Sequence, residues 1–214
     1  MTDKDLYGKA GKEDPEEPPQ GFLSSIFGSF NKTFWVVNAF ELFERGAYYG
    51  TMAVLAIHVV NNLGIDRDTW GALYSFLIIL LYFVPLFSAA LAEKIGFKQM
   101  LLVAFSVMMV GYTALSFVQP DDLTALVVAF LFVGIGAGLF KPIISASIAH
   151  VTPEEKRNLA YSIYYWMINL GAVLAPFSIA VAFPEESLYY YVFLVSTGLV
   201  FLNIIILLTL FKNP

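Results

Sequence analysis

The chain has 214 residues, of which 58% are hydrophobic, 14% are charged and none is cysteine. So small a charged share leaves too much apolar surface for a soluble domain and also excludes a disordered chain. The net charge of −5 argues against a nucleic-acid binder, and the absence of cysteine excludes disulfides and thiolate metal sites. These numbers predict a polytopic membrane protein.

Residues 1–32 are predicted to be a tail and a lead into the first membrane span. Lys, Asp, Glu, Pro and Gly dominate the first 21 residues, a composition typical of disorder. Five apolar side chains then recur at helical spacing: Phe22, Leu23, Ile26, Phe27 and Phe30. They indicate either a short interfacial helix or a simple hydrophobic approach to the span.

Six apolar stretches follow, each close to the ~20 residues that cross a bilayer as a helix. They cover residues 34–60, 70–92, 100–118, 123–149, 159–183 and 188–211. Their apolar runs are continuous and do not alternate, which favours helices over a β-barrel. We therefore expect an all-α membrane protein with a six-helix transmembrane bundle over residues 33–214.

The basic residues predict how the bundle is oriented. Nine of them fall in the N-terminal tail, the second and fourth loops and the C-terminus, whereas the other three loops hold only Arg67. The nine are Lys4, Lys9, Lys12, Lys32, Lys94, Lys98, Lys156, Arg157 and Lys212. Because Lys and Arg are enriched in cytoplasmic loops, both termini are expected in the cytoplasm, with the protein in the plasma membrane.

Four Glu, Lys or Arg residues lie inside the predicted spans, where a charge is energetically costly. Three of them share one face of the first predicted helix, because Glu44 and Arg45 follow Glu41 by three and four residues. Glu41 precedes Arg45 by one turn, the favourable order for an ion pair within a helix. Lys141 is alone in the fourth span. Because those glutamates are the only carboxylates at that depth, we expect the first and fourth helices to face each other across a polar cavity.

The two glutamates also predict a site that exchanges protons. Two carboxylates this close cannot both be ionised cheaply in a low dielectric, so one of them is expected to bind and release a proton near neutral pH.

The fourth predicted span also carries residues that affect helix packing. Gly134 and Gly138 have the spacing that permits close helix approach. Pro142 predicts a kink beside Lys141.

The fifth predicted span carries a line of hydrogen-bonding side chains. Tyr161, Tyr165 and Asn169 recur one turn apart, and Tyr164 lies beside them. They are expected to form a polar wall for a substrate, with interhelical hydrogen bonding or an interfacial aromatic belt as the alternatives. Tyr82 in the second span is a weaker candidate of the same kind.

Three segments together resemble the proton-dependent oligopeptide transporters of the major facilitator superfamily. Residues 41–50, Glu-Leu-Phe-Glu-Arg-Gly-Ala-Tyr-Tyr-Gly, are similar to the family's ExxER…YYG motif, with Gly46 where the family has Phe. Residues 136–142, Gly-Ala-Gly-Leu-Phe-Lys-Pro, resemble its fourth-helix segment. Residues 162–171, Ser-Ile-Tyr-Tyr-Trp-Met-Ile-Asn-Leu-Gly, resemble its FYxxIN-G signature.

The resemblance implies one half of a major facilitator fold, built from two three-helix repeats. It implies that Glu41 and Glu44 carry or gate the proton and that Lys141 is their ion-pair partner. It also implies that Arg45 and Lys141 attract the carboxylate end of a peptide. With Tyr165 added from the fifth-span pattern, the expected substrate-binding residues are Arg45, Tyr48, Tyr49, Tyr82, Lys141, Tyr165 and Asn169.

Because the family places its substrate between two six-helix halves, a second six-helix body is expected as a partner. It could be a missing half, a separate chain or a second copy.

The predicted function is proton-coupled symport of di- or tripeptides, with protons as the coupling ion and no cofactor. The alternatives are a half-transporter for another carboxylate or a drug-like solute, and a non-transporting membrane subunit. An enzyme is not expected, because HExxH, GxSxG and His/Cys ligand sets are absent from the sequence.

Overall fold

The computed structural model describes residues 26–212, and its backbone in that range forms helices joined by short loops, without a strand. The long helices are α2 (Lys32–Ile57), α3 (Arg67–Phe83), α4 (Pro85–Ile95), α5 (Phe97–Phe117), α6 (Leu123–Val151), α7 (Arg157–Ala182) and α8 (Tyr189–Thr209). Three short helices, η1 (His58–Asn62), η2 (Glu154–Lys156) and η3 (Glu186–Leu188), adjoin them. The all-α class predicted from the sequence is confirmed.

Residues 26–30 belong to a separate unit from residues 31–214. Residues 26–28 make one helical turn, closed by a hydrogen bond from the Ser29 amide to the Ile26 carbonyl oxygen (3.1 Å). The Phe27 side chain is exposed. The predicted tail, with Phe22 and Leu23 of the expected interfacial helix, lies outside the described residues.

Four stretches are long and apolar enough to cross a membrane: Phe97–Phe117, Leu123–Val151, Glu154–Ala182 and Glu186–Thr209. α3 and α4 add a fifth if they are taken together as one bent span. α2 is 26 residues long but carries the three charged residues of the first predicted span near its middle. The described chain therefore has the make-up of a multi-pass membrane protein.

The second predicted span, residues 70–92, is broken in two. α3 ends at Phe83, α4 begins at Pro85, and the two helices meet at 42°. Pro85 has no amide hydrogen to bond the preceding turn, and proline is tolerated in the first turn of a new helix. α6 is not interrupted at Pro142, and the kink predicted there from the sequence stays a prediction.

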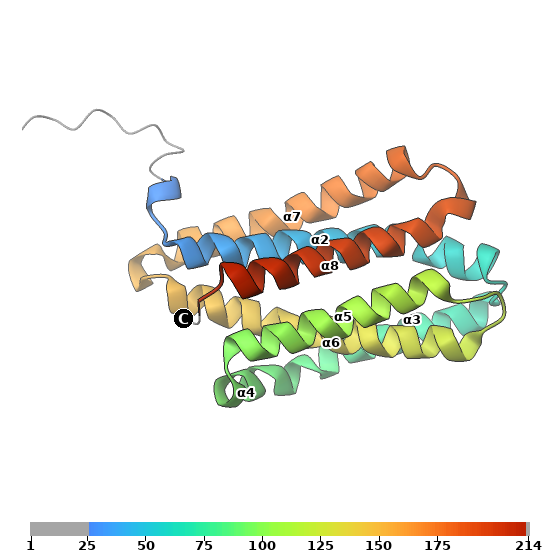
Figure 1. Cartoon of the computed structure of the whole chain (residues 1–214), viewed down its shortest axis with the longest axis horizontal. Coiled ribbons are helices and arrows are strands. Elements are labelled where there is room, and N and C mark those ends of the chain that lie inside the picture. The colour runs from blue at the N-terminus through green and yellow to red at the C-terminus, as the bar shows by residue number, and fades with distance from the viewer. Residues whose placement is uncertain (1–25, 213–214) are drawn as a thin grey trace, which may run out of the picture. The chain divides into compact units, whose positions relative to one another are not determined.

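The helices of the bundle pack in two groups that meet along α5 and α8. α2 packs on α7 and α8, while α6 packs on α5 and on the α3–α4 pair (Figure 1). Small residues on α6 permit the second set of contacts. A Cβ at Gly134 would lie 2.8 Å from the Leu80 Cβ, and one at Gly138 would lie 2.7 Å from the Val84 Cβ. The predicted glycine pair thus brings α6 against the break between α3 and α4.

A row of buried phenylalanine rings joins the two helices that carry the intramembrane charges. The Phe105 ring on α5 lies 5.4 Å from the Phe40 ring on α2 and 5.3 Å from the Phe140 ring on α6. All three side chains are fully buried. Phe40 and Phe140 directly precede Glu41 and Lys141 in the chain. Their packing on Phe105 therefore sets the positions of Glu41 and Lys141 along the lengths of α2 and α6.

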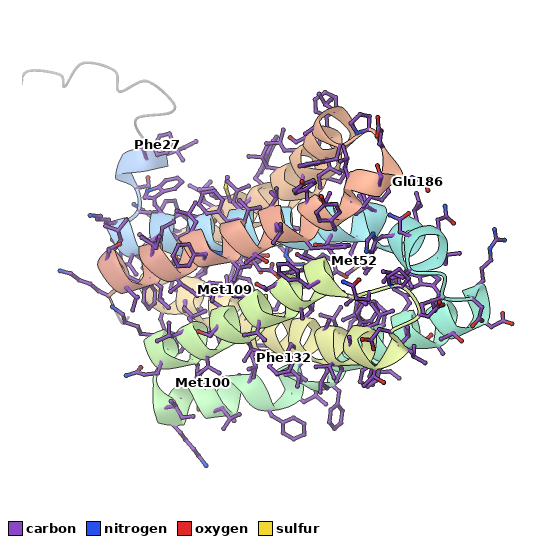
Figure 2. The ribbon with its side chains drawn as sticks, turned by 45° about the vertical axis from the view of Figure 1, so that its right-hand side comes forward. Phe27, Met52, Met100, Met109, Phe132 and Glu186 are labelled. Atoms are coloured by element: carbon purple, nitrogen blue, oxygen red, sulfur yellow. The ribbon has the colours of Figure 1, made fainter. Side chains whose placement is uncertain are left out.

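At its C-terminal end α2 continues into the π-helix η1, which is tied to the loop before α8. Asn61 donates a hydrogen bond to the Glu186 carboxylate (3.0 Å), and Asn62 donates one to the Glu186 carbonyl oxygen (2.6 Å). Glu186 lies at the end of the bundle marked in Figure 2. These hydrogen bonds hold the C-terminal end of α2 and η1 against the start of η3.

Candidate functional site

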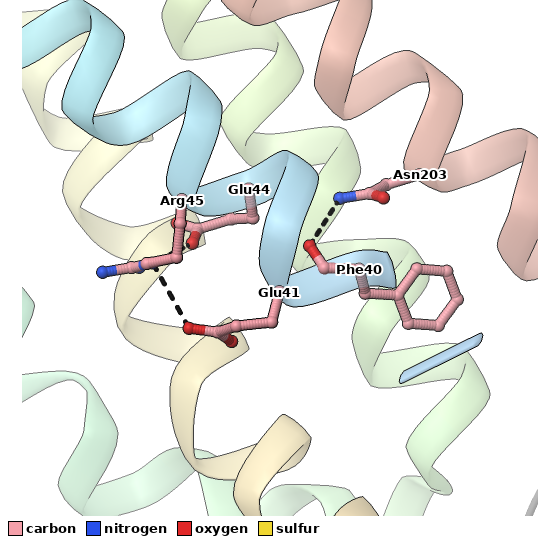
Figure 3. A network of polar contacts seen from close by, with 5 residues as sticks. All are labelled: Phe40, Glu41, Glu44, Arg45 and Asn203. Carbon is pink, nitrogen blue, oxygen red and sulfur yellow. Dashed lines mark hydrogen bonds and ion pairs between the residues drawn. The ribbon is translucent and has the colours of Figure 1, made fainter. Parts of the chain in front are cut away.

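The charged turn of α2 is buried inside the bundle. The side chains of Glu41 and Glu44 are fully buried, and Arg45 is 6% exposed. The Arg45 Nε lies 2.6 Å from the Glu44 Oε2 and 3.4 Å from the Glu41 Oε1, so one guanidinium is paired with both carboxylates. Figure 3 shows the far end of the guanidinium pointing away from α2.

Two carboxylates around one cation leave an excess negative charge in a dry site. Both oxygens of Glu41 and the Glu44 Oε1 are buried and lack a hydrogen-bond partner in the described part of the chain. An unpaired buried charge is costly, and one proton on either carboxylate would neutralise the cluster. The arrangement is therefore chemically suited to taking up and releasing a proton.

Aromatic rings hold the outer face of the guanidinium. The Arg45 Cζ lies 5.0 Å from the centre of the Tyr48 ring and 5.9 Å from that of Tyr49. The two rings meet edge to face, 5.3 Å apart. Such cation–π contacts stabilise a guanidinium that is only partly hydrated. Tyr48 and Tyr49 thus orient Arg45, in addition to the contact with substrate predicted for them.

A pocket of about 340 Å³ lies between α2, the α3–α4 break and α6. Its lining residues are Arg45, Tyr48, Ile78, Leu81, Tyr82, Pro85, Ala137, Lys141, Pro142 and Ser145. This volume is in the range of small-molecule sites. Arg45 and Lys141 line the pocket together, which confirms that the first and fourth predicted helices face one cavity. Glu41 and Glu44 are buried and are not part of the lining.

The ion pair of Lys141 with the glutamates, implied by the family resemblance, is not formed. Across residues 26–212 the Lys141 ammonium has no carboxylate within 4.0 Å, and its side chain is exposed. The physical reason is that Arg45 already holds both carboxylates. Lys141 is left as a second cation on the pocket wall, near enough to Glu41 to interact with it electrostatically.

The other predicted site residues divide between the pocket and the face of α7. Tyr82 lines the pocket with 76% of its side chain exposed. Tyr165 is 60% exposed, Asn169 is exposed as well, and neither lines the pocket. The structure therefore brings Tyr82 together with Arg45 and Lys141, but leaves Tyr165 and Asn169 on an open surface.

Two buried residues near the cluster were not among the sequence candidates. Asn203 on α8 donates a hydrogen bond to the Phe40 carbonyl oxygen (3.1 Å), as Figure 3 shows. The Tyr112 hydroxyl on α5 is fully buried, lacks a hydrogen-bond partner among described residues and lies in electrostatic range of Glu44 and Arg45. Each is a polar residue in the middle of an apolar stretch. A polar side chain at such a position is the pattern from which the sequence could have indicated both residues.

The part of the chain that the structure describes holds no cluster of three His, Cys, Asp or Glu side chains able to bind a metal ion. The pocket brings together two cations and the hydroxyls of Tyr48, Tyr82 and Ser145, with a pair of buried carboxylates beside Arg45.

Comparison with known proteins gives a consistent picture. The family model for the Major Facilitator Superfamily matches residues 35–214. The chain is 30% identical over 167 residues to the uncharacterized transporter YclF of Bacillus subtilis, which covers 74% of this chain and 32% of the relative. It is 29% identical to dipeptide and tripeptide permease A of Chromobacterium violaceum and 26% identical to that of Citrobacter koseri. These matches cover 67% and 66% of this chain, and 30% and 28% of the permeases.

Solved structures of similar fold are peptide transporters. A POT family transporter in complex with 5-aminolevulinic acid matches with a TM-score of 0.76 at 28% identity, covering 90% of this chain and 40% of that one. A peptide transporter POT mutant in complex with sulfate gives the same score at 26% identity, with 89% and 39% covered. The resemblance to proton-dependent oligopeptide transporters is confirmed. The chain spans about a third of the length of the curated relatives it matches.

Proposed function

The chain belongs to the major facilitator superfamily, and we propose that it is the N-terminal six-helix part of a proton-coupled symporter for small peptides. The superfamily consists of transporters, which agrees with the expectation that the chain is not an enzyme. The observation that carries the proposal is the pairing of Arg45, which contacts two buried carboxylates on one side and lines a pocket on the other.

The pocket wall favours the carboxylate end of a peptide. Arg45 and Lys141 both line it, and no Asp or Glu is among its lining residues. Arg binds carboxylates through its planar fork, whereas Lys adds a mobile point charge. The amino end of a peptide needs a negative partner, which we assign to a second six-helix body. Names of relatives such as dipeptide and tripeptide permease A support small peptides as the substrate.

Proton coupling follows from competition for Arg45. A substrate carboxylate that binds the guanidinium weakens its hold on Glu41 and Glu44, and a released carboxylate in a dry site then gains a proton. By linkage, protonation of a glutamate frees Arg45 for the substrate to the same extent. The substrate and the proton therefore favour each other's binding, as a symporter requires.

For the architecture, we propose six spans, with α3 and α4 acting as one bent span and both termini in the cytoplasm of a plasma-membrane protein. The two repeats would be α2 to α5 and α6 to α8. The packing supports this assignment. The packed pairs of the first repeat have counterparts in the second. α2 packs on α7 as α6 packs on the α3–α4 pair, α2 packs on α8 as α6 packs on α5, and α5 packs on α8 between the repeats. This is the symmetry expected of two three-helix repeats.

We test the proposal by measuring uptake of a labelled dipeptide into cells that express the reading frame containing this chain. Uptake is recorded with and without an inward proton gradient. Glu41→Gln and Glu44→Gln each remove one ionisable carboxylate and are expected to abolish gradient-driven accumulation, while exchange of substrate down its own gradient persists. Glu93→Gln on the exposed end of α4 is the matched control, because it removes a carboxylate outside the cluster. Accumulation that survives in both cluster variants would refute proton coupling at this site.

Another carboxylate solute is the second candidate, and the same pocket observation favours it. Two cations without a lining carboxylate bind any carboxylate, and the pocket itself does not select a peptide backbone. Competition between the labelled dipeptide and either an N-acetylated dipeptide or a simple organic acid separates the two cases. Peptide transport predicts weak competition by both analogues, because each lacks the amino group that the second body receives.

A further inference from the structure

Tyr164 on α7 has a buried hydroxyl that lacks a hydrogen bond. The side chain is 3% exposed, and its hydroxyl has no partner among the residues described. Buried hydroxyl groups in proteins are nearly always hydrogen-bonded, so an exception calls for a physical explanation. The hydroxyl faces two groups, the Glu41 carboxyl and Ser145, without completing a hydrogen bond to either in this arrangement.

The packing of α7 on α2 fixes Tyr164 against Glu41. Two turns beyond Tyr164, Gly171 lies so close to α2 that a Cβ added there would be 2.8 Å from the Arg45 Cβ. The backbones of the two helices are therefore in near contact at the charged turn. A rigid approach of this kind holds the phenol beside the carboxyl group.

The surroundings of Glu41 leave Tyr164 as its available hydrogen-bond donor besides Arg45. The charged and titratable groups that face Glu41 are Arg45 and Glu44 on α2, Lys141 from α6 and Tyr164 from α7. Glu44 is another carboxyl group, and Lys141 is exposed on the pocket wall with no ion pair to Glu41. Both Glu41 oxygens lack a hydrogen bond.

We propose that Tyr164 is a positioning residue of the proton site, donating a hydrogen bond to the Glu41 carboxylate when that carboxylate separates from Arg45. This inference rests on the proposed function, in which substrate binding draws Arg45 away from the glutamates. At that moment Glu41 either gains a proton or finds another donor. The Tyr164 hydroxyl is that donor, and it stabilises the charged carboxylate, so protonation requires a lower pH. Its place corresponds to the Phe of the FYxxIN-G signature, so the hydroxyl is an addition to the pattern that residues 162–171 resemble.

The test uses Tyr164→Phe, which removes the hydroxyl, keeps the ring and restores the residue of the signature. The purified chain in lipid nanodiscs is titrated with acid in excess sulfate, an anion that competes with Glu41 for Arg45 and has no carbonyl band of its own. The carbonyl band of protonated carboxyl groups is followed by infrared difference spectroscopy. Glu41→Gln identifies the part of the band that belongs to Glu41. We expect Tyr164→Phe to move the midpoint of that part to higher pH by about one unit, the size expected for one hydrogen bond to a charged group.

A matched control is available one turn away on the same helix. The Tyr161 hydroxyl donates to the Ser145 carbonyl oxygen (3.4 Å) and does not face Glu41. Tyr161→Phe removes an equivalent hydroxyl from α7 and is expected to leave the midpoint unchanged. Circular dichroism and thermal unfolding establish that both variants fold like the original chain.

The outcomes separate this inference from the proposed function. A Glu41→Gln variant that removes no titrating band would show that Glu41 does not exchange protons, and the tyrosine inference would then fail. The proposed function would in that case rest on Glu44, and the uptake measurement on both cluster variants decides it. Where Glu41→Gln removes a band but Tyr164→Phe leaves its midpoint within the control's range, the tyrosine inference alone is overturned. A midpoint that moves to lower pH would also overturn it, since it would mean that the hydroxyl favours the protonated form.

Discussion

Two buried carboxylates share one guanidinium on α2. The excess of one negative charge determines how much free energy it costs to bury the charged turn. Arg45 contacts both glutamates through its Nε, while two tyrosine rings flank its Cζ. Taking charges out of water is costly, and their attraction compensates only when the geometry is good. A site that is expensive to build and contributes little to stability is best understood as functional, which favours transport over a non-transporting subunit.

Removing the guanidinium alone should therefore lower the stability of the fold, whereas removing all three charges should change the stability much less. We expect Arg45→Met to lower the free energy of unfolding by about 3–5 kcal/mol, because it leaves two buried carboxylates unpaired. The triple variant Glu41→Gln, Glu44→Gln, Arg45→Met should recover most of that loss. Chemical unfolding of the purified protein in detergent measures both values. A triple variant no more stable than Arg45→Met would contradict this account.

The residues of this site and the pairing of Glu41 with Arg45 were predictable from spacing, whereas the position of Lys141 relative to the glutamates was not. Three- and four-residue intervals place Glu41, Glu44 and Arg45 on one face in any helix, so that cluster follows from the sequence alone. Whether Lys141 also pairs with the glutamates depends on the distance between α2 and α6, which no local pattern encodes. The Glu41–Arg45 pair predicted from that spacing is formed, whereas the pairing of Lys141 that the family resemblance implied is not.

At the scale of single helices, apolar length predicts where helices lie but not where they bend. Hydrophobicity is uniform through residues 70–92, so the break before Pro85 has no signature in hydropathy. The proline itself was the available clue, but prolines also occur inside straight membrane helices because neighbouring helices satisfy the freed backbone groups. Pro142 likewise lies inside a helix, because α6 continues through it without a break.

Helix approach in this bundle depends on positions where no Cβ fits. A Cβ at Gly136 on α6 would lie 2.7 Å from the Met108 amide nitrogen of α5, closer than real contacts allow. We expect Gly136→Ala to destabilise the bundle by about 1–3 kcal/mol, the usual cost of overpacking. Gly71→Ala on α3 is the control, because nothing lies within 4 Å of the added Cβ. Thermal unfolding in detergent compares the two, and equal melting temperatures would contradict the prediction.

At the scale of the whole molecule, α7 presents a large apolar face with polar residues set into it. Trp166, Val173, Phe177 and Val181 are each more than two-thirds exposed, and Asn169 is exposed among them. A lipid-facing helix has no use for an asparagine at mid-depth. This face suits the second six-helix body that we propose, because Asn169 and Tyr165 would then meet protein and not lipid.

Our last prediction is that the 214-residue chain does not transport as a monomer. Its pocket is lined by two cations and by no Asp or Glu, and alternating access requires two bodies that rock around a central site. Two copies around one cavity would double the cations without supplying a carboxylate for an amino group, so a homodimer should prefer anions to zwitterionic peptides. Reconstitution into proteoliposomes, with mass determined in the same sample, measures dipeptide uptake against a proton gradient. Robust peptide uptake by a preparation shown to be monomeric would prove this prediction wrong.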